Sequence, residues 1–242
     1  MPEPIARAYP DRIEVRGRDL GALIGRLSFS AYFHLLLTGE EPTEEQRFFL
    51  DALLVAIAEH GLMPTNVAAR MTLAADPGSL QGALAAGILG CGPVLLGTAE
   101  ECARLLERLA AGLEPAAAAH EIHAAGGRAP GFGHPVHSPV DPRAERILAL
   151  ADEHGVAGRH VALARAFADT VAAEWGKPLV VNVSLPIAAV LLDLGFRADA
   201  VKAVPLLART ASLLAHLADE SERPLGLLLA AAAEEAGRDA GA

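Results

Sequence analysis

The chain has 242 residues, of which 52% are hydrophobic and 21% charged, so it is not a disordered chain and is long enough to bury a substantial core. Aromatic residues make up only 4%, and the abundance of Ala and Leu favours helices over strands. With 30 acidic and 20 basic residues, the net charge of −10 provides no general attraction to nucleic acid or to an anionic membrane surface. An anionic ligand would have to meet a local cluster of cations. Only Lys177 and Lys202 are lysines, so arginines would supply it.

The composition also indicates the cellular setting. Cys91 and Cys102 are too few for a disulfide scaffold and lack the spacing of metal ligands, so we expect no metal site. The first residues have no apolar signal-peptide core, and we expect a cytoplasmic protein. The uncharged stretch 77–99 is long enough to span a bilayer, but its glycines and prolines favour a buried helix broken by turns, with no membrane partner.

Helical signals follow one another closely along the chain. After a short alternating segment at 12–16, apolar residues at steps of three and four predict one amphipathic helix within 18–38, ending at Gly39. Thr43 and Gln46 form a capping-box pair that begins the next helix, which His60 and Gly61 end. Further helices are expected near 64–75, 79–90, 98–112, 115–125, 142–154, 158–175, 184–194, 197–219 and 222–236. The predicted fold class is therefore all-α.

Two Gly/Pro-containing segments, 126–135 and 176–178, suggest hinges within the chain. We expect a large helical domain formed by 1–112 and 194–242, with a small domain, 113–193, inserted between its two parts. A cleft between two such domains can close over a substrate and exclude water.

Chemistry is concentrated in residues 131–143, which read Gly-Phe-Gly-His-Pro-Val-His-Ser-Pro-Val-Asp-Pro-Arg. The glycines on either side of Phe132 let the backbone approach a ligand, and His134 follows on the same loop as a candidate proton carrier. Asp141 as N-cap and Pro142 at the first helical position place Arg143 in a first turn, where an arginine can bind a carboxylate. The alternative is an ordinary Gly/Pro loop with a surface histidine.

The string Gly-Phe-Gly-His followed by Asp-Pro-Arg closely resembles the small-domain signature of the citrate synthase family. Further segments resemble the family in the same order, namely 13–20, 32–40, 60–70, 207–216 and 222–224. The shortness of the chain resembles the compact citryl-CoA lyase-like branch. The resemblance implies a two-domain helical fold and a homodimer. It also implies chemistry that joins acetyl-CoA to oxaloacetate, or cleaves citryl-CoA, with the coenzyme A thioester as substrate and no permanently bound cofactor.

The resemblance also implies roles for single residues. It places His60 and His134 around the keto or tertiary hydroxyl group of the four-carbon acid. The carboxylates of this acid would be held by Arg143, Arg209 and Arg223, and Arg223 would reach into the site of the neighbouring subunit. The thioester end of coenzyme A would lie along Gly131, Phe132, Gly133 and Asn182. An arginine on the buried face of an Ala/Leu-rich helix, as Arg209 is, needs an anionic partner in any case.

Two positions depart from the family pattern. Leu95 stands where a histidine commonly stabilises the enolate oxygen, and Ser184 stands where an aspartate removes the acetyl α-proton. Leucine cannot donate a hydrogen bond, and a serine hydroxyl is a poor base at pH 7. Both changes affect the acetyl-CoA half of the chemistry, so a carbon–carbon lyase fits better than a synthase. His137 and His123 are candidate replacement acids, but the sequence does not show whether either lies near the substrate.

Other interpretations stay open at this point. The chain could be a non-catalytic homologue that keeps the tricarboxylate pocket, or an enzyme for another pair of acyl-CoA and 2-oxo acid, with an apolar acyl group near Leu95 and Leu96. His60 could simply cap a helix C-terminus, Ser184 could be a helix N-cap, and Arg223 could be a surface residue. Trp175 and the cysteines are interpreted as packing residues.

Overall fold

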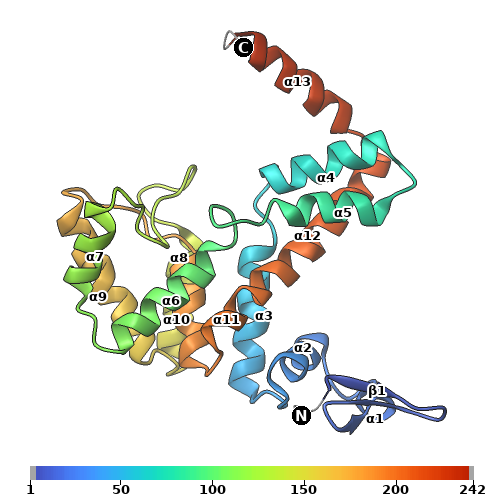
Figure 1. Cartoon of the computed structure of the whole chain (residues 1–242), viewed down its shortest axis with the longest axis horizontal. Coiled ribbons are helices and arrows are strands. Elements are labelled where there is room, and N and C mark those ends of the chain that lie inside the picture. Colours follow the sequence, from blue (N-terminus) through green and yellow to red (C-terminus); the bar gives the residue numbers. More distant parts are fainter. Residues whose placement is uncertain (1–3, 240–242) are drawn as a thin grey trace.

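A computed structural model describes residues 4–239, and they fold mainly into helices, which confirms the predicted all-α class (Figure 1). The strands of the described chain are three short ones near its start: β1 (Ala6–Ala8), β2 (Ile13–Val15) and β3 (Arg18–Asp19). They form an antiparallel sheet in the order β1-β2-β3, with Ala6 opposite Val15 and Glu14 opposite Asp19. The alternating segment at 12–16 is thus the central strand of a small sheet.

The single helix predicted within 18–38 is wrong, because this region contains two helices, α1 (Leu20–Leu23) and α2 (Phe29–Thr38). Gly25 takes a left-handed φ of 80°, which turns the chain between them. The Ser28 side chain then accepts a hydrogen bond from the backbone N–H of Ala31, which starts α2 as a new helix. The two helices also pack differently, since α1 contacts β2 and β3 whereas α2 contacts α3.

The remaining helices follow the predicted order. They are α3 (Glu44–Ala58), α4 (Pro64–Ala75), α5 (Leu80–Leu89), α6 (Thr98–Ala110), α7 (Pro115–Ala124), α8 (Pro142–Glu153), α9 (Arg159–Glu174), α10 (Ser184–Asp193), α11 (Ala198–Val201), α12 (Ala203–Glu222) and α13 (Gly226–Asp239). The capping box of Thr43 and Gln46 is present at the start of α3. The helix predicted over 197–219 is divided at Lys202 into α11 and α12.

Two groups of helices build the molecule (Figure 1). In one, α10 is buried from Leu185 to Leu192 and packs against α6, α8, α9 and α11. In the other, α12 packs against α3, α4 and α5 and buries Leu213 and Leu217. α6 packs with α9, α10 and α11 although the sequence suggested that it belongs to the large domain; the domain limits stay a prediction.

Two apolar stretches resemble membrane spans in composition. The segment Ala198–Glu222, which contains α11 and α12, is long and apolar enough to cross a bilayer. Within this structure it buries the charged side chains of Arg209 and Glu220 and packs against α3, α4 and α5, as a core helix does. The stretch 77–99 contains α5 followed by turns at 90–97, as predicted, but α5 is not the buried helix that was expected, because its buried residues are only Ala83 and Gly87.

Candidate active site

A cavity of about 950 Å³ lies where the two helix groups meet. Segments from both groups line it: the loop after α3, the turns before α6, the loop before α8, the stretch before α10, and α12. It brings together most of the residues expected to act on substrate, namely His60, Leu95, Phe132, Gly133, His134, Arg143, Asn182, Ser184 and Arg209. Gly131 and Arg223 are not among its lining residues.

The loop that carries His134 is held against the start of α10. Gly131 and Gly133 have left-handed φ angles of 82° and 81°. A Cβ on Gly131 would lie 2.6 Å from Cβ of Leu185, so this glycine lets the loop pack on α10 and is not itself exposed to the cavity. The backbone N–H of Gly133 donates to Val180 O at 2.7 Å, and the Asn182 side chain donates to Gly133 O at 3.1 Å. Asn182 therefore fixes the loop as well as lining the cavity.

Asp141 anchors Arg143 at the beginning of α8. This carboxylate is 1% exposed and accepts hydrogen bonds from the backbone N–H, Nε and Nη2 of Arg143, as well as from the backbone N–H of Val183. Burial acts to raise the pKa of Asp141, but the hydrogen bonds from Arg143 outweigh it and lower the pKa. The predicted N-cap is present, and it also joins α8 to the start of α10.

His134 presents an N–H to the cavity. Its Nδ1 accepts hydrogen bonds from the backbone N–H groups of Val136 at 3.1 Å and His137 at 2.8 Å, so its proton lies on Nε2. Nη2 of Arg143, also a donor, lies 3.3 Å from that Nε2. Burial, followed by the nearby His137 and His60, lowers the pKa of His134 and keeps it neutral. Two donors that face each other in this way can both bind one substrate oxygen.

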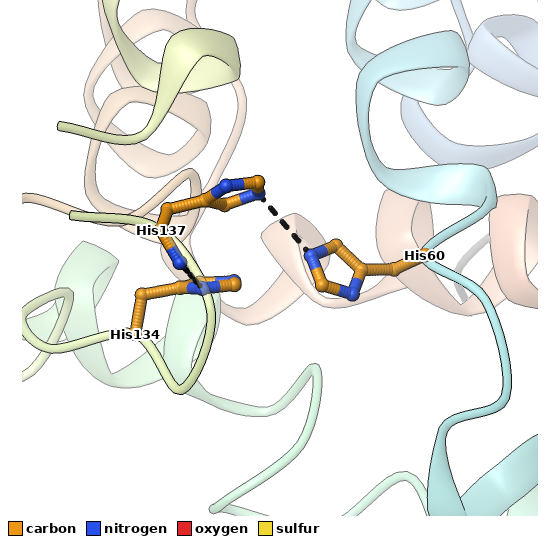
Figure 2. Close-up of side chains that lie close together, drawn as sticks. All are labelled: His60, His134 and His137. Atoms are coloured by element: carbon orange, nitrogen blue, oxygen red, sulfur yellow. Dashed lines mark hydrogen bonds between the residues drawn. The ribbon is translucent and has the colours of Figure 1, made fainter.

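His60 enters the cavity from the other helix group, on the loop after α3. Its Nε2 lies 3.3 Å from Nε2 of His137, and Figure 2 shows its ring pointing toward both other histidines. Among the described residues its ring is hydrogen-bonded to His137 and to no carbonyl of α3 (Glu44–Ala58), so it does not cap that helix. Burial, followed by the positive charge of Arg143, lowers the pKa of His60. His60 is thus a neutral imidazole at the meeting point of the two helix groups.

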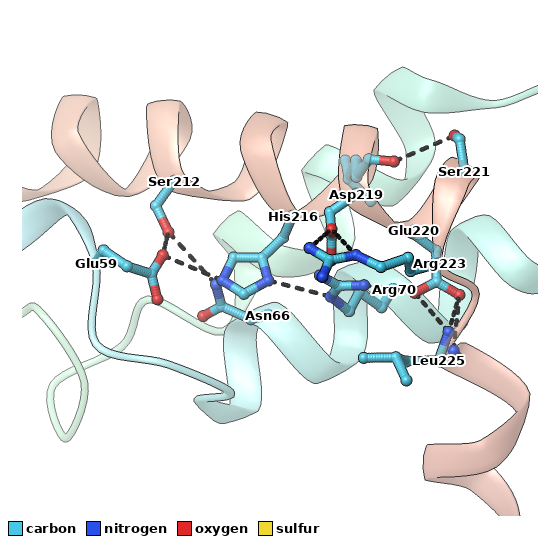
Figure 3. A network of polar contacts seen from close by, with 12 residues as sticks. Glu59, Asn66, Arg70, Ser212, His216, Asp219, Glu220, Ser221, Arg223 and Leu225 are labelled. Atoms are coloured by element: carbon cyan, nitrogen blue, oxygen red, sulfur yellow. Dashed lines mark hydrogen bonds and ion pairs between the residues drawn. The ribbon is translucent and has the colours of Figure 1, made fainter.

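A polar network behind His60 ties its loop to α12 (Figure 3). The Glu59 carboxylate accepts hydrogen bonds from the backbone N–H groups of His60 and Gly61 and from the side chains of Ser212 and His216. Partial burial acts to raise the pKa of Glu59, but these hydrogen bonds lower it overall. Glu59 therefore stays ionised and holds the His60 backbone in place.

Arg209, on α12, is the most deeply buried cation at the cavity. It is 4% exposed, and its Nη1 donates to the amide oxygen of Asn66 at 3.1 Å. Its Nε has no hydrogen-bond partner among the described residues. Burial lowers the pKa of Arg209, which shows that the protein itself does not fully compensate this charge. An anionic ligand would do so.

The turns before α6 give the cavity an apolar stretch, and Thr98 and Glu101 at the start of α6 line it as well. Pro93, Val94, Leu95 and Leu96 line it, and Leu95 offers no polar atom toward the ligand space. Ser184 is the first residue of α10 and Val183 is the N-cap, so the alternative of Ser184 as N-cap is wrong. The backbone N–H of Ser184 donates to the Asn182 side chain at 3.0 Å, and the serine lines the cavity.

A family model described as the citrate synthase C-terminal domain matches residues 3–225. The chain belongs to the citrate synthase family. It is 29% identical over 201 residues to a citrate synthase of Heyndrickxia coagulans, covering 81% of this chain and 53% of that protein. It is 27% identical over 212 residues to a citrate synthase of Haloferax volcanii, covering 86% of this chain and 55% of that protein. This family member thus spans about half the length of these two relatives.

Solved structures of the family agree with the fold. The citryl-CoA lyase of Hydrogenobacter thermophilus superposes with a TM-score of 0.83 and 31% identity, covering 89% of this chain and 85% of that one. The ATP citrate lyase of Methanothrix soehngenii, solved in complex with citrate and coenzyme A, has a TM-score of 0.80 at 22% identity and covers 90% of this chain and 38% of that one. The predicted citrate-synthase-like fold is confirmed.

Sequence reasoning missed several lining residues of this citrate synthase family member. Arg128 and Lys177 bring further positive charge, and Trp175, interpreted above as a packing residue, contributes its ring. His123, a candidate replacement acid, stacks on Trp175 and contacts Glu174, and it is not a lining residue. No motif marks Arg128, Trp175 and Lys177, and the one signal that the sequence offered for them is their position in or beside the Gly/Pro segments.

One ring nitrogen from each of His60, His134 and His137 lies within 4.8 Å of the other two, a spacing that could suit a metal ion. A metal ligand must offer an unprotonated nitrogen, whose ring partner then usually donates its N–H. In His134, two backbone N–H groups occupy Nδ1, which leaves the proton on Nε2. His134 therefore does not fit a metal ligand as it is held here, and the cluster suits proton transfer better.

Proposed function

We propose that this protein is a carbon–carbon lyase that cleaves a citryl-CoA-like 3-hydroxy-3-carboxyacyl-CoA into an acyl-CoA and a 2-oxo acid. Citryl-CoA, which gives acetyl-CoA and oxaloacetate, is the first candidate substrate. The observation that carries the proposal is an asymmetry of the cavity. Arg143, Arg209 and His134 line it together and can bind an anion, whereas Leu95 and Ser184 stand where the family pattern has a histidine and an aspartate.

The anion-binding side suits a dicarboxylate with a central oxygen. Arg209 has a buried Nε without a partner, and Arg143 is held rigidly by Asp141. These two guanidinium groups would bind carboxylates, and the Nε2–H of His134 would donate to the hydroxyl or keto oxygen. This assignment explains how a chain of net charge −10 can bind a polyanion.

Cleavage uses what this cavity contains. His60 takes the proton of the tertiary hydroxyl, the oxygen electrons form the C=O of the oxo acid, and the carbon–carbon bond breaks. Its electron pair passes to the thioester as an enolate, which the Ser184 hydroxyl can stabilise by donation. The acyl carbon then gains the proton that the hydroxyl lost. The reverse reaction would need a base for the acetyl α-proton, and Ser184 is a poor one.

The remaining lining residues support a thioester with a long polar arm. Arg128 and Lys177 would attract the phosphates of coenzyme A, and the Trp175 ring can contact its base. The citryl-CoA lyase of Hydrogenobacter thermophilus, whose fold is similar over most of both chains, is named for this reaction.

The test is turnover in each direction. Purified protein is incubated with citryl-CoA while oxaloacetate release is followed, and separately with acetyl-CoA plus oxaloacetate while free thiol is followed. We expect cleavage well above the His134→Ala control and little or no synthesis. Equal rates for wild type and control in both directions would refute a citryl-CoA enzyme.

Two other possible functions can be distinguished from the proposed lyase with the same purified protein. Tight citrate binding by calorimetry without turnover would identify a non-catalytic homologue, as the absent histidine and aspartate suggest. Turnover only with other pairs of acyl-CoA and 2-oxo acid would show that the apolar wall at Leu95 and Leu96 accommodates a different acyl group.

We also propose a homodimer in which Arg223 reaches the partner's cavity. Leu89 and Val94, near the cavity-lining turns, and Leu227 and Leu228, on the projecting α13, are exposed and would supply an apolar interface. Within its own chain Arg223 pairs with Asp219 and its side chain is 78% exposed, so it is free to serve another subunit. Light scattering at micromolar concentration tests this, and a monomer would contradict it.

A further inference from the structure

His137 contacts both histidines that face the substrate space, through two different groups. Its backbone N–H donates to Nδ1 of His134 at 2.8 Å, and its ring Nε2 lies 3.3 Å from Nε2 of His60 (Figure 2). Its ring also stacks on that of His134, with centroids 4.2 Å apart. The residue is half-buried and is not itself a lining residue of the cavity.

The backbone contact decides what His134 can do. Because Nδ1 accepts this N–H and that of Val136, the neutral ring carries its proton on Nε2. His134 can therefore donate to a substrate oxygen but cannot take a proton from it without first losing its own. Arg143, 3.3 Å from Nε2, opposes any further positive charge there.

The side-chain contact decides what His60 can do. Two neutral imidazoles whose Nε2 atoms face each other at 3.3 Å can share one proton, with one ring as donor and the other as acceptor. The pair spans the two helix groups, because His60 follows α3 and His137 precedes α8. Other charged groups near His60 are Arg143, Asp141 and Glu59; Arg143 and Asp141 pair with each other, and Glu59 bonds the His60 backbone.

We propose that His137 is a positioning residue that gives the two substrate-facing histidines opposite roles: His134 as hydrogen-bond donor and His60, paired with His137, as proton acceptor. This inference rests on the proposed lyase function, and it identifies the His60–His137 pair as the base that accepts the hydroxyl proton. The neutral pair holds two protons, one between the two Nε2 atoms and one on Nδ1 of His137, so Nδ1 of His60 is free to accept another. Nδ1 of His60 takes a third proton from the tertiary hydroxyl as the carbon–carbon bond breaks, and the acyl carbon regains that proton directly or through water.

The proposal accounts for chemistry without the usual groups. Leu95 cannot hold a proton and Ser184 is a weak base, whereas His60 and His134 line the cavity and are of the residue type that exchanges protons near neutral pH. A lone His60 beside Arg143 would be a poor acceptor, since the imidazolium would form next to a guanidinium. Sharing the charge with His137 spreads it over two rings and away from Arg143.

The direct test is spectroscopic and needs no turnover. Full-length protein with ¹⁵N-labelled histidine rings is measured at pH 7.5 for coupling between the Nε2 atoms of His60 and His137 across a shared proton. We expect that coupling in the wild type, with a proton on Nε2 of His134. Independent rings without coupling would overturn the proposal even if the enzyme is active.

The functional test compares three variants in the citryl-CoA cleavage assay. His137→Phe should lower kcat about 100-fold, the typical worth of an acid–base group, with KM changed less than about two-fold. His137→Gln, whose amide can replace Nε2 as a partner for His60, should recover kcat to within about ten-fold of wild type. His120→Phe, a control on an exposed histidine outside the cavity, should match the wild type.

The outcomes separate the possible failures. A His137→Phe variant that binds citrate normally and keeps wild-type kcat would overturn the proposal, as would a Gln variant no better than Phe. Stimulation of the wild type by Zn²⁺ and its loss with a chelator would also overturn it, by assigning the rings to a metal. Absence of wild-type turnover would refute the proposed lyase, whereas the coupling measurement would still decide whether the pair exists.

Discussion

Two buried arginines near α12 have opposite surroundings. Arg70, on α4, is 3% exposed, and its guanidinium donates to Glu220 at 2.8 Å, Asp219 at 2.6 Å and His216 at 3.1 Å (Figure 3). Arg209 is 4% exposed but donates only to the neutral amide of Asn66, with its Nε unpartnered among the described residues. The two arginines are almost equally buried. They differ in whether other described residues supply an anionic partner for the guanidinium group.

The comparison teaches that burial alone does not reveal what a charged residue is for. The hydrogen bonds that Arg70 donates to the two carboxylates outweigh burial and raise the pKa of Arg70, whereas burial lowers the pKa of Arg209. Arg70 joins α4 to α12, and Glu220 also accepts the backbone N–H groups at the start of α13. Arg70 therefore holds the fold together, while Arg209 is ready for a ligand.

The largest expected effect is on folding stability when Arg70 is replaced by Leu. The change leaves the buried Glu220 carboxylate without its cation, and breaking such a pair costs about 3 to 5 kcal/mol. Urea unfolding followed by circular dichroism measures the loss. The double variant with Glu220→Gln should recover part of it, and a single variant as stable as wild type would contradict the structural role.

Replacing Arg209 by Met should give the opposite pattern. Because the wild-type cation lacks an anionic partner, the free energy of unfolding without ligand should stay within about 1 kcal/mol of wild type or rise. Citrate binding by calorimetry should weaken about 100-fold, since a charge-assisted contact contributes roughly 1.5 to 3 kcal/mol. Arg209→Met that unfolds easily yet binds citrate normally would reverse our assignment of the two arginines.

The cationic cavity also predicts how stability depends on pH. The folded-state pKa values of His60 and His134 are lowered below the ordinary value of about 6.5. The unfolded chain therefore binds protons first as pH falls through 6.5, so the free energy of unfolding should decrease there and keep decreasing down to the folded-state pKa values. Denaturation at pH 7 and pH 5.5 checks this. The free energy of unfolding of the double variant His60→Gln/His134→Gln should depend less on pH than that of wild type. His120→Gln, the control, should show the same pH dependence as wild type.

The smallest stability effect is expected for Arg223→Ala. Its side chain is largely exposed and pairs with Asp219 only one turn away, so the urea midpoint should not change measurably. Turnover should nevertheless fall, because in the proposed dimer each cavity receives Arg223 from the partner. Mixing Arg223→Ala chains with Arg209→Met chains tests this. Recovery of activity in the mixed dimers would support an arginine donated between subunits, and full activity of Arg223→Ala alone would exclude that role.

Local signals predicted much of this molecule. The capping box at Thr43, the Asp141 cap before Arg143 and the glycines around Phe132 act on neighbouring residues, so the sequence displays them directly. The break at Gly25 was missed because the apolar spacing continues across it. The partners of Arg70 lie about 150 positions away, and no local pattern identifies them.

By itself, the sequence determined the helical class, the order of the helices and the membership of the citrate synthase family, because caps, periodicity and motifs are written within short windows. Its resemblance to the family also predicts that Leu95 and Ser184 stand where a catalytic histidine and aspartate commonly stand. Only the tertiary structure decided that Arg209 forms no ion pair with the described residues, that Arg128 and Lys177 join the cavity, and that His137 meets His60 from the other helix group. Those properties depend on which distant side chains share a buried space, and only packing brings them together.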